Sequence, residues 1–217
     1  MRQNTFLPLG YLSALLLLLL HPGFASPKKL QVSYDRSSIV AVTHKSGLLR
    51  FLGHEHGILV TAWSADVTYD DAAPTSSRVS IKIPVRALVI DAEEARVKAE
   101  LDTQGPSPDD IKKMQHKMLS EKVFDAEKYP EIVFTTASVE PQAAGKWILR
   151  GLLTIRGISQ PVTVPVILAR QQEAFNVTGR FRIKQTAYGI KPESIAGVVE
   201  VADEVDIQFD IWGRPEA

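Results

Sequence analysis

The chain has 217 residues, 45% of them hydrophobic, which is enough to bury the core of one sizeable domain. Its 25 basic and 25 acidic side chains balance, and no long run carries one sign, which argues against non-specific binding to nucleic acid or to an acidic membrane surface. It has no cysteine, so a small scaffold held by disulfides and a lipoprotein anchor are both excluded.

Residues 1–25 show the order of features of a secretory signal peptide. A positive start at Arg2 precedes the apolar run of residues 11–20, "YLSALLLLLL", and small Ala25 stands at a plausible cleavage point. The run is about half of the ~20 residues that a membrane-spanning helix requires, so a retained anchor is the less favoured alternative. We therefore expect a mature chain of residues 26–217, periplasmic or secreted, that forms one domain and has no transmembrane segment.

Beyond this leader, apolar and polar side chains alternate with a period of two. Such alternation predicts strands with one dry and one wet face. The predicted strands, in chain order, are residues 39–43, 59–69, 78–90, 131–139, 147–155, 162–168, 175–183 and 199–211. The phase of the last strand breaks only at Asp203. Clusters of glycine, proline and aspartate separate most of the strands.

A single helical pattern interrupts the strands, over residues 107–122. Ser107 is placed to cap it, Pro108 occupies the first helical position, and Asp110 completes a capping box. The apolar residues that share one face at helical spacing are Ile111, Met114 and Met118. Packing of this face against the core is the favoured interpretation, and an adaptable methionine-bearing lid over a cavity is the alternative.

The predicted fold is mainly β. About eight one-sided antiparallel strands must close on themselves or stack, and closure hides their edges best. We therefore predict a single antiparallel, lipocalin-like barrel of about eight strands with one helix insertion near residues 107–122. An eight-stranded barrel is either filled by side chains or holds one small ligand. A two-sheet sandwich is the competing architecture.

Catalytic motifs are scarce. The chain has no cysteine nucleophile, no G-x-S-x-G elbow, no glycine-rich phosphate loop and no H-E-x-x-H zinc helix. Acidic pairs such as Glu93-Glu94 and Asp109-Asp110 suit a solvated surface or a helix start. We therefore expect no enzyme activity, no catalytic residue and no cofactor.

His54 and His56, in "FLGHEHGI", are the candidates for a metal or a polar rim. In an extended segment residues i and i+2 face the same side, so both imidazoles could reach one ion. A catalytic zinc needs a third protein ligand, and His44, His116 or a carboxylate are candidates that no spacing singles out. The favoured interpretation places both histidines at a barrel rim, and the sequence assigns no metal.

Two stretches carry a more specific pattern. Residues 123–140, "VFDAEKYPEIVFTTASVE", and 151–166, "GLLTIRGISQPVTVPV", resemble the signature of the YceI-like family, exported lipocalin-like proteins associated with binding polyisoprenoid chains. Residues 183–211 resemble the closing segment of that family, and residues 33–58 resemble its first two strands more loosely. The resemblance runs from about residue 30 to residue 211, nearly the whole mature chain.

The resemblance implies an exported, non-enzymatic protein that holds an amphiphilic lipid such as a polyisoprenoid in the barrel. The candidate lining, taken from the dry faces of two strands, is Val162, Val164, Val166, Phe175, Val177, Phe181 and Ile183. These side chains would equally fill a solid barrel. A metal-binding protein or enzyme using His54 and His56, and a ligand-free, stress-related interaction module, are the alternatives, and the sequence leaves the oligomeric state open.

The segment "GLLRFLGHEHGI" departs from the pattern of the ordinary lipid-binding members, which have a polar, phenylalanine-containing second strand here. The departure suggests a different mouth to the barrel, suited to a head group, a metal or a partner.

Overall fold

The computed structural model describes residues 27–47, 54–70, 73–102, 105–195 and 199–216. The predicted signal peptide lies outside the described residues, as do residues 51–53 before His54. The strands are β1 (Lys28–Val32), β2 (Ser38–Ser46), β3 (His56–Val60), β4 (Ser64–Tyr69), β5 (Arg78–Pro84), β6 (Leu88–Ile90), β7 (Glu131–Pro141), β8 (Lys146–Ile155), β9 (Ile158–Gln171), β10 (Ala174–Lys184), β11 (Ser194–Ile195) and β12 (Val199–Pro215). The helices are α1 (Glu93–Lys98) and α2 (Pro108–Leu119), with the short 3-10 turns η1 (Tyr34–Arg36), η3 (Pro74–Ser76), η4 (Val85–Ala87) and η5 (Gln185–Tyr188).

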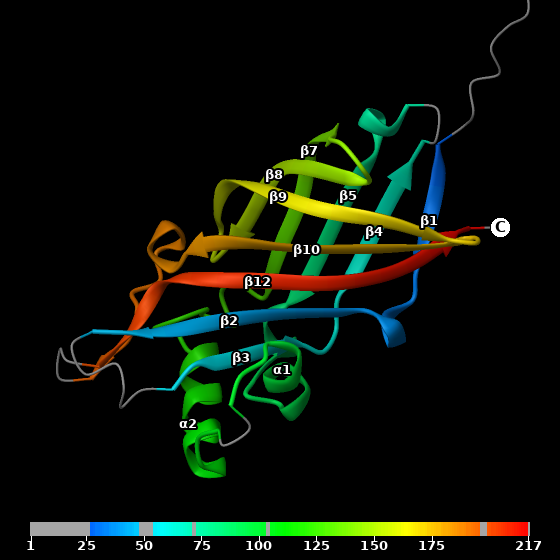
Figure 1. The fold of residues 1–217 in the computed structure, drawn as a ribbon. Coiled ribbons are helices and arrows are strands. Elements are labelled where there is room, and N and C mark those ends of the chain that lie inside the picture. The colour runs from blue at the N-terminus through cyan, green and yellow to red at the C-terminus, as the bar shows by residue number, and fades with distance from the viewer. Residues whose placement is uncertain (1–26, 48–53, 71–72, 103–104, 196–198, 217) are drawn as a thin grey trace, which may run out of the picture.

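Eight of the described strands form a closed antiparallel barrel (Figure 1). Their order around the ring is β1, β4, β5, β7, β8, β9, β10 and β12, and β12 pairs again with β1. Closure removes the free edges that two stacked sheets would leave. The predicted barrel is therefore confirmed, and the sandwich alternative is wrong.

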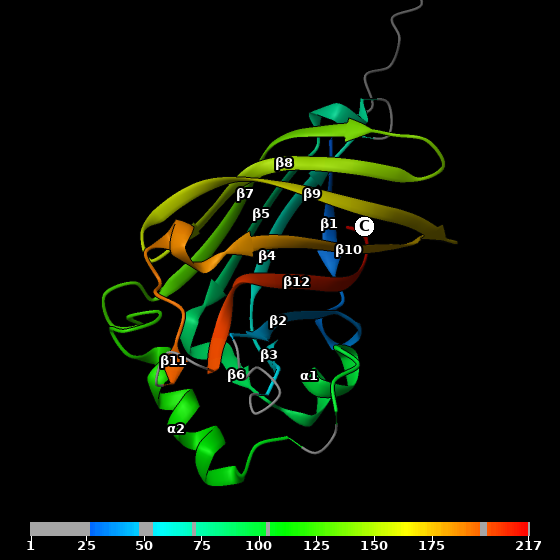
Figure 2. The ribbon, with the colours of Figure 1, turned by 60° about the vertical axis from the view of Figure 1, so that its left-hand side comes forward.

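The 17-residue strand β12 pairs both within the barrel and with a strand outside it. Its final residues pair with β1 and close the barrel, whereas most of its length pairs with β2. Beyond β2 the sheet continues through β3 to β6. Both views place α1 and α2 on the side of this extension (Figure 1, Figure 2), so the extension and its helices cover one end of the barrel.

Two strands predicted as continuous are broken. Residues 59–69 form the end of β3 and the whole of β4, separated at residues 61–63, because the backbone N–H and side-chain hydroxyl of Thr61 both donate to the carbonyl of Ala87 and hold the chain there. Residues 78–90 divide into β5, the turn η4 and β6. Pro84 stands at this division and cannot donate to a continuing ladder.

The predicted helix is confirmed as α2, which begins at Pro108. The hydroxyl of Ser107 accepts a hydrogen bond from the backbone N–H of Asp110 (3.2 Å), the expected cap. Ile111, Met114 and buried Met118 pack on the main core cluster, as the favoured interpretation requires. Helix α1, which has six residues, was not predicted from the sequence.

One side chain fastens α2 to the sheet. The amide of Gln115 accepts from the N–H of Ile90 (3.0 Å) and donates to the carbonyl of Leu88 (2.8 Å). Both groups belong to the outer edge of β6, so the amide replaces the backbone of a further strand.

Particular residues explain the tight turn between β8 and β9 and the register shift in β12. Arg156 and Gly157 have φ of 53° and 71°, the left-handed pair of a tight hairpin between β8 and β9. The register of β12 against β2 shifts between Val201 and Val205, where the predicted alternation breaks. There the carboxylate of Asp203 accepts from the N–H and the hydroxyl of Thr186, which ties β12 to η5.

Candidate ligand-binding cavity

The barrel is hollow. It encloses a cavity of about 1290 Å³, larger than the roughly 300–1,000 Å³ of most small-molecule pockets. Inward-facing side chains of all eight barrel strands line it, together with β2, β3, β6 and α2. Most of the lining is aliphatic or aromatic, as the dry faces of alternating strands require.

The structure places six of the seven predicted lining residues on the wall of this cavity. They are Val164, Val166, Phe175, Val177, Phe181 and Ile183. Val162, the seventh, is half-buried and packs against the main core cluster. Contact of these side chains with a ligand stays a prediction. The wall contributed by β4, β5 and β7 was not predicted, although β5 and β7 show the same alternation. Met114 and Met118 of α2 also line the cavity, as the lid alternative for this helix would have them do.

The wall formed by β2 and β3 becomes polar towards one end. From the interior outwards, the cavity-facing residues are Ile39, Ala41, Thr43 and Lys45 on β2 and Val60, Ile58 and His56 on β3. Thr43 and His56 lie directly opposite one another in the ladder. Exposed His54, just before β3, also lines the cavity. The wall therefore grades from apolar through neutral polar to charged.

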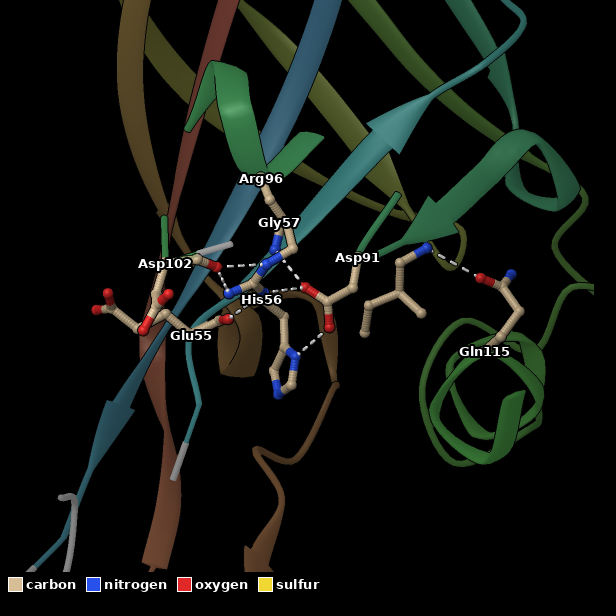
Figure 3. Close-up of polar contacts among 8 residues, drawn as sticks. Glu55, His56, Gly57, Asp91, Arg96, Asp102 and Gln115 are labelled. Carbon is tan, nitrogen blue, oxygen red and sulfur yellow. Dashed lines mark hydrogen bonds and ion pairs between the residues drawn. The ribbon is translucent and has the colours of Figure 1, made fainter. Parts of the chain in front are cut away.

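Behind this polar wall, His56 is held by a buried ion pair (Figure 3). Its Nδ1 lies 2.6 Å from Oδ2 of Asp91, whose side chain is fully buried, and Oδ1 of Asp91 accepts from the guanidinium of Arg96 at 2.8 Å. The backbone N–H of Gly57 also donates to Asp91 (3.2 Å). The imidazole itself keeps 14% exposure, so it forms the boundary between this cluster and the cavity.

Arg96 connects the cluster to two further chain segments. Its guanidinium donates to the carbonyls of Glu55 (3.2 Å) and Asp102 (2.8 Å from Nε). The buried positive charge therefore has two carbonyl partners besides the carboxylate of Asp91. Burial alone would raise the pKa of Asp91, but its hydrogen bond and charge interaction with His56, aided by Arg96 and Gly57, lower it overall. Asp91 is therefore an ionised acceptor in the folded protein.

The histidine pair does not form a recognisable metal centre. Only His56 joins the Asp91 cluster, and His54 is exposed. Within the described ranges, no three histidine or carboxylate side chains are grouped as metal ligands. Among the residues that it describes, the structure therefore gives the metal hypothesis no third ligand, and it puts both histidines on the cavity wall near its polar end.

A second polar network lies on the outer face of β2, β12 and β10. His44 bridges two carboxylates, with Nδ1 2.9 Å from Glu55 and Nε2 3.0 Å from Asp206. Arg182 donates two hydrogen bonds to Asp206 (2.7 and 2.9 Å). Its guanidinium, with help from His44, lowers the pKa of Asp206 to about 2. The bond to Glu55, with that to Asp206, raises the pKa of His44 despite its partial burial.

These shifts predict a pH window for the network. Asp206 has a depressed pKa, so its contribution is present above about pH 4, its unfolded value, and is lost as the pH falls towards 2. The pKa of His44 is raised, so its contribution is complete below 6.5 and is lost as the pH rises through the higher folded value. We expect wild type to exceed Asp206→Asn in stability by about 1 kcal/mol between about pH 4 and 6.5, because Arg182 is exposed and water screens the pair. Urea unfolding of both proteins across pH measures this difference, and a difference that stays constant down to pH 2 would contradict it.

A family model describing the YceI-like domain matches residues 31–212. The chain belongs to the YceI-like family. The resemblance drawn from its sequence motifs is thus confirmed, and the family is one of binding-protein barrels.

Two curated relatives and several solved structures agree with this assignment. A UPF0312 protein of Shewanella baltica is 28% identical over 102 residues, and the aligned region covers 47% of this chain and 44% of that protein, less than half of its length. A UPF0312 protein of Photorhabdus laumondii is 26% identical over 169 residues, which cover 69% of this chain and 78% of that one.

Among solved structures, BcnA of Burkholderia cenocepacia superposes with a TM-score of 0.63 at 23% identity, covering 84% of this chain and 99% of that one. The YceI protein of Campylobacter jejuni gives a TM-score of 0.54 at 16% identity, covering 74% and 84%. At these identities the likeness shows the fold of this YceI-like protein. No helix in the part of the chain that the structure describes is long and apolar enough to cross a membrane.

Proposed function

We propose that this YceI-like protein is an exported carrier that holds the apolar tail of an amphiphilic, isoprenoid-type lipid inside its barrel. The proposal assigns it no reaction. The observation that carries it is the hollow, mainly aliphatic cavity of about 1290 Å³. A filled barrel, the basis of the ligand-free alternative, would leave no such volume.

Physical chemistry supports a long chain as the occupant. Removing apolar surface from water contributes about 25 cal/mol per Å², or about 0.8 kcal/mol for each buried methylene. A branched hydrocarbon chain offers this surface along its whole length and needs no polar partner inside. The graded wall of β2 and β3 then gives the polar head a place at the end of the cavity where Lys45 and His54 lie.

Export belongs to the same proposal. It rests on the predicted signal peptide, residues 1–25. A carrier outside the cytoplasm needs to shield a tail from water and to accommodate a polar head, and a cavity with an apolar interior and one polar end fits that task.

A mass spectrum of the protein isolated from cells that express the full chain tests both parts. The native spectrum should show an excess of several hundred daltons that is lost on denaturation, and fragmentation of the released molecule should identify an isoprenoid-type lipid. The denatured mass should equal that of residues 26–217. Equal native and denatured masses, followed by failure to take up added isoprenoid lipids, would contradict the carrier proposal, and an uncleaved chain would contradict export.

A further inference from the structure

We infer that His56, together with Thr43, forms a recognition site for an uncharged hydroxyl head group, so that the barrel selects isoprenoid alcohols over their ethers and phosphate esters. This inference rests on the proposed lipid-carrier function. It comes from the cluster of His56, Asp91 and Arg96, which borders the cavity through the imidazole of His56.

The buried ion pair fixes which hydrogen bond His56 offers to the cavity. Asp91 is ionised, so it can only accept, and the short contact of 2.6 Å therefore places a proton on Nδ1 of His56. In the neutral imidazole the other nitrogen, Nε2, is then an acceptor. Figure 3 shows it turned away from Asp91, and it has no partner among the described residues.

Because the imidazole of His56 is held in place, its Nε2 favours a ligand that can donate a hydrogen bond. Oδ1 of Asp91 is already engaged by Arg96 and by the N–H of Gly57, so the carboxylate cannot turn and release the imidazole without losing three hydrogen bonds. The ring is therefore pre-organised, and binding costs little ordering of this side chain. A hydroxyl can donate to Nε2, whereas an ether oxygen cannot.

Thr43 offers the complementary bond. It lies directly opposite His56 in the β2–β3 ladder and also lines the cavity, and opposed side chains on one face have Cβ atoms about 4.5–5.5 Å apart. Its hydroxyl can donate to the head-group oxygen while the O–H of the head group donates to Nε2 of His56. A hydroxyl group, which both donates and accepts, satisfies both residues.

The charges around this end of the cavity favour an uncharged head over a phosphate. The charged lysine and acidic side chains that line it are Lys45, Lys117, Lys191, Asp110, Glu193 and Glu200, three of each sign. One lysine, Lys117, is already paired with Glu193 at 2.5 Å. Balanced charges create no strong positive field for an anion.

Titration of the ligand-free wild-type protein with geranylgeraniol, its methyl ether and its monophosphate tests the inference. Trp63 and Trp147 line the cavity, so their fluorescence can report binding. We expect the alcohol to bind about tenfold more tightly than the ether, and more tightly than the phosphate. His56→Phe and, separately, Thr43→Val should reduce the preference for the alcohol. The matched His116→Phe variant, at an exposed histidine of α2 outside the cavity lining, should keep it.

The outcomes separate this inference from the carrier proposal. Equal binding of alcohol and ether to wild type would overturn the head-group site and leave the carrier intact. Tighter binding of the phosphate would also overturn the site. Failure of all three molecules to bind would overturn both proposals. Thr43→Val alters one nearly isosteric side chain, so it decides the matter even if His56→Phe does not fold.

Discussion

Replacing Asp91 with alanine should lower the free energy of unfolding by about 3–5 kcal/mol, a large fraction of the stability of a single domain. The fully buried carboxylate is the counter-charge of Arg96, whose side chain is only 8% exposed. Without it the guanidinium stays buried with only carbonyl partners, at Glu55 and Asp102. His56 loses its anchor in the same step.

Urea unfolding followed by circular dichroism measures this loss. Glu121→Ala, a change at an exposed carboxylate, is the matched control and should stay within about 0.5 kcal/mol of wild type. The double variant Asp91→Ala/Arg96→Met removes both charges and should be less destabilised than the sum of its single changes. Additive losses in this cycle would show that the two side chains do not act as a pair.

Filling the cavity should abolish tight binding of a long isoprenoid while leaving the barrel folded. Ile81 on β5 and Val177 on β10 both face the cavity, from strands on separate parts of the ring. Changing both to tryptophan should displace about four methylene-sized groups of a bound chain, at about 0.8 kcal/mol each. The dissociation constant should therefore rise by about 100-fold or more.

The control for this experiment uses the adjacent residues on the same strands. Successive side chains of a strand point to opposite faces, so Lys82→Trp/Thr178→Trp adds the same two rings outside the barrel. This control should bind like wild type. Titration with geranylgeraniol measures both variants, and unchanged affinity in Ile81→Trp/Val177→Trp would place the ligand outside the cavity.

The barrel was predictable because its signal is local. Alternation in stretches such as residues 175–183 needs only neighbouring side chains, and the tight turn at Gly157 needs only its own backbone. The breaks at residues 61–63 and after Pro84 were not predicted, because contacts with Ala87 and with a turn determine them. No glycine or proline marks the first break.

The candidate site, too, was predictable only in part. The inward faces of β9 and β10 were visible as alternation, and the histidines were visible as a motif. The partner that orients His56 is Asp91, 35 residues further along the chain, and only the β3–β6 pairing brings them together. A carboxylate directly after the short apolar run of residues 88–90 was the available signal. Nothing in its spacing connected it to the histidines.

The amide of Gln115 also affects how this protein interacts with neighbouring molecules. The outer edge of β6 presents an N–H at Ile90 and a carbonyl at Leu88, the groups through which one sheet recruits a strand from another molecule. A helix side chain occupies both, so α2 shields the edge from intermolecular strand pairing. Helix α2, which also lines the cavity, therefore protects the protein from aggregation, and any loosening of α2 would expose a β-edge to neighbouring chains.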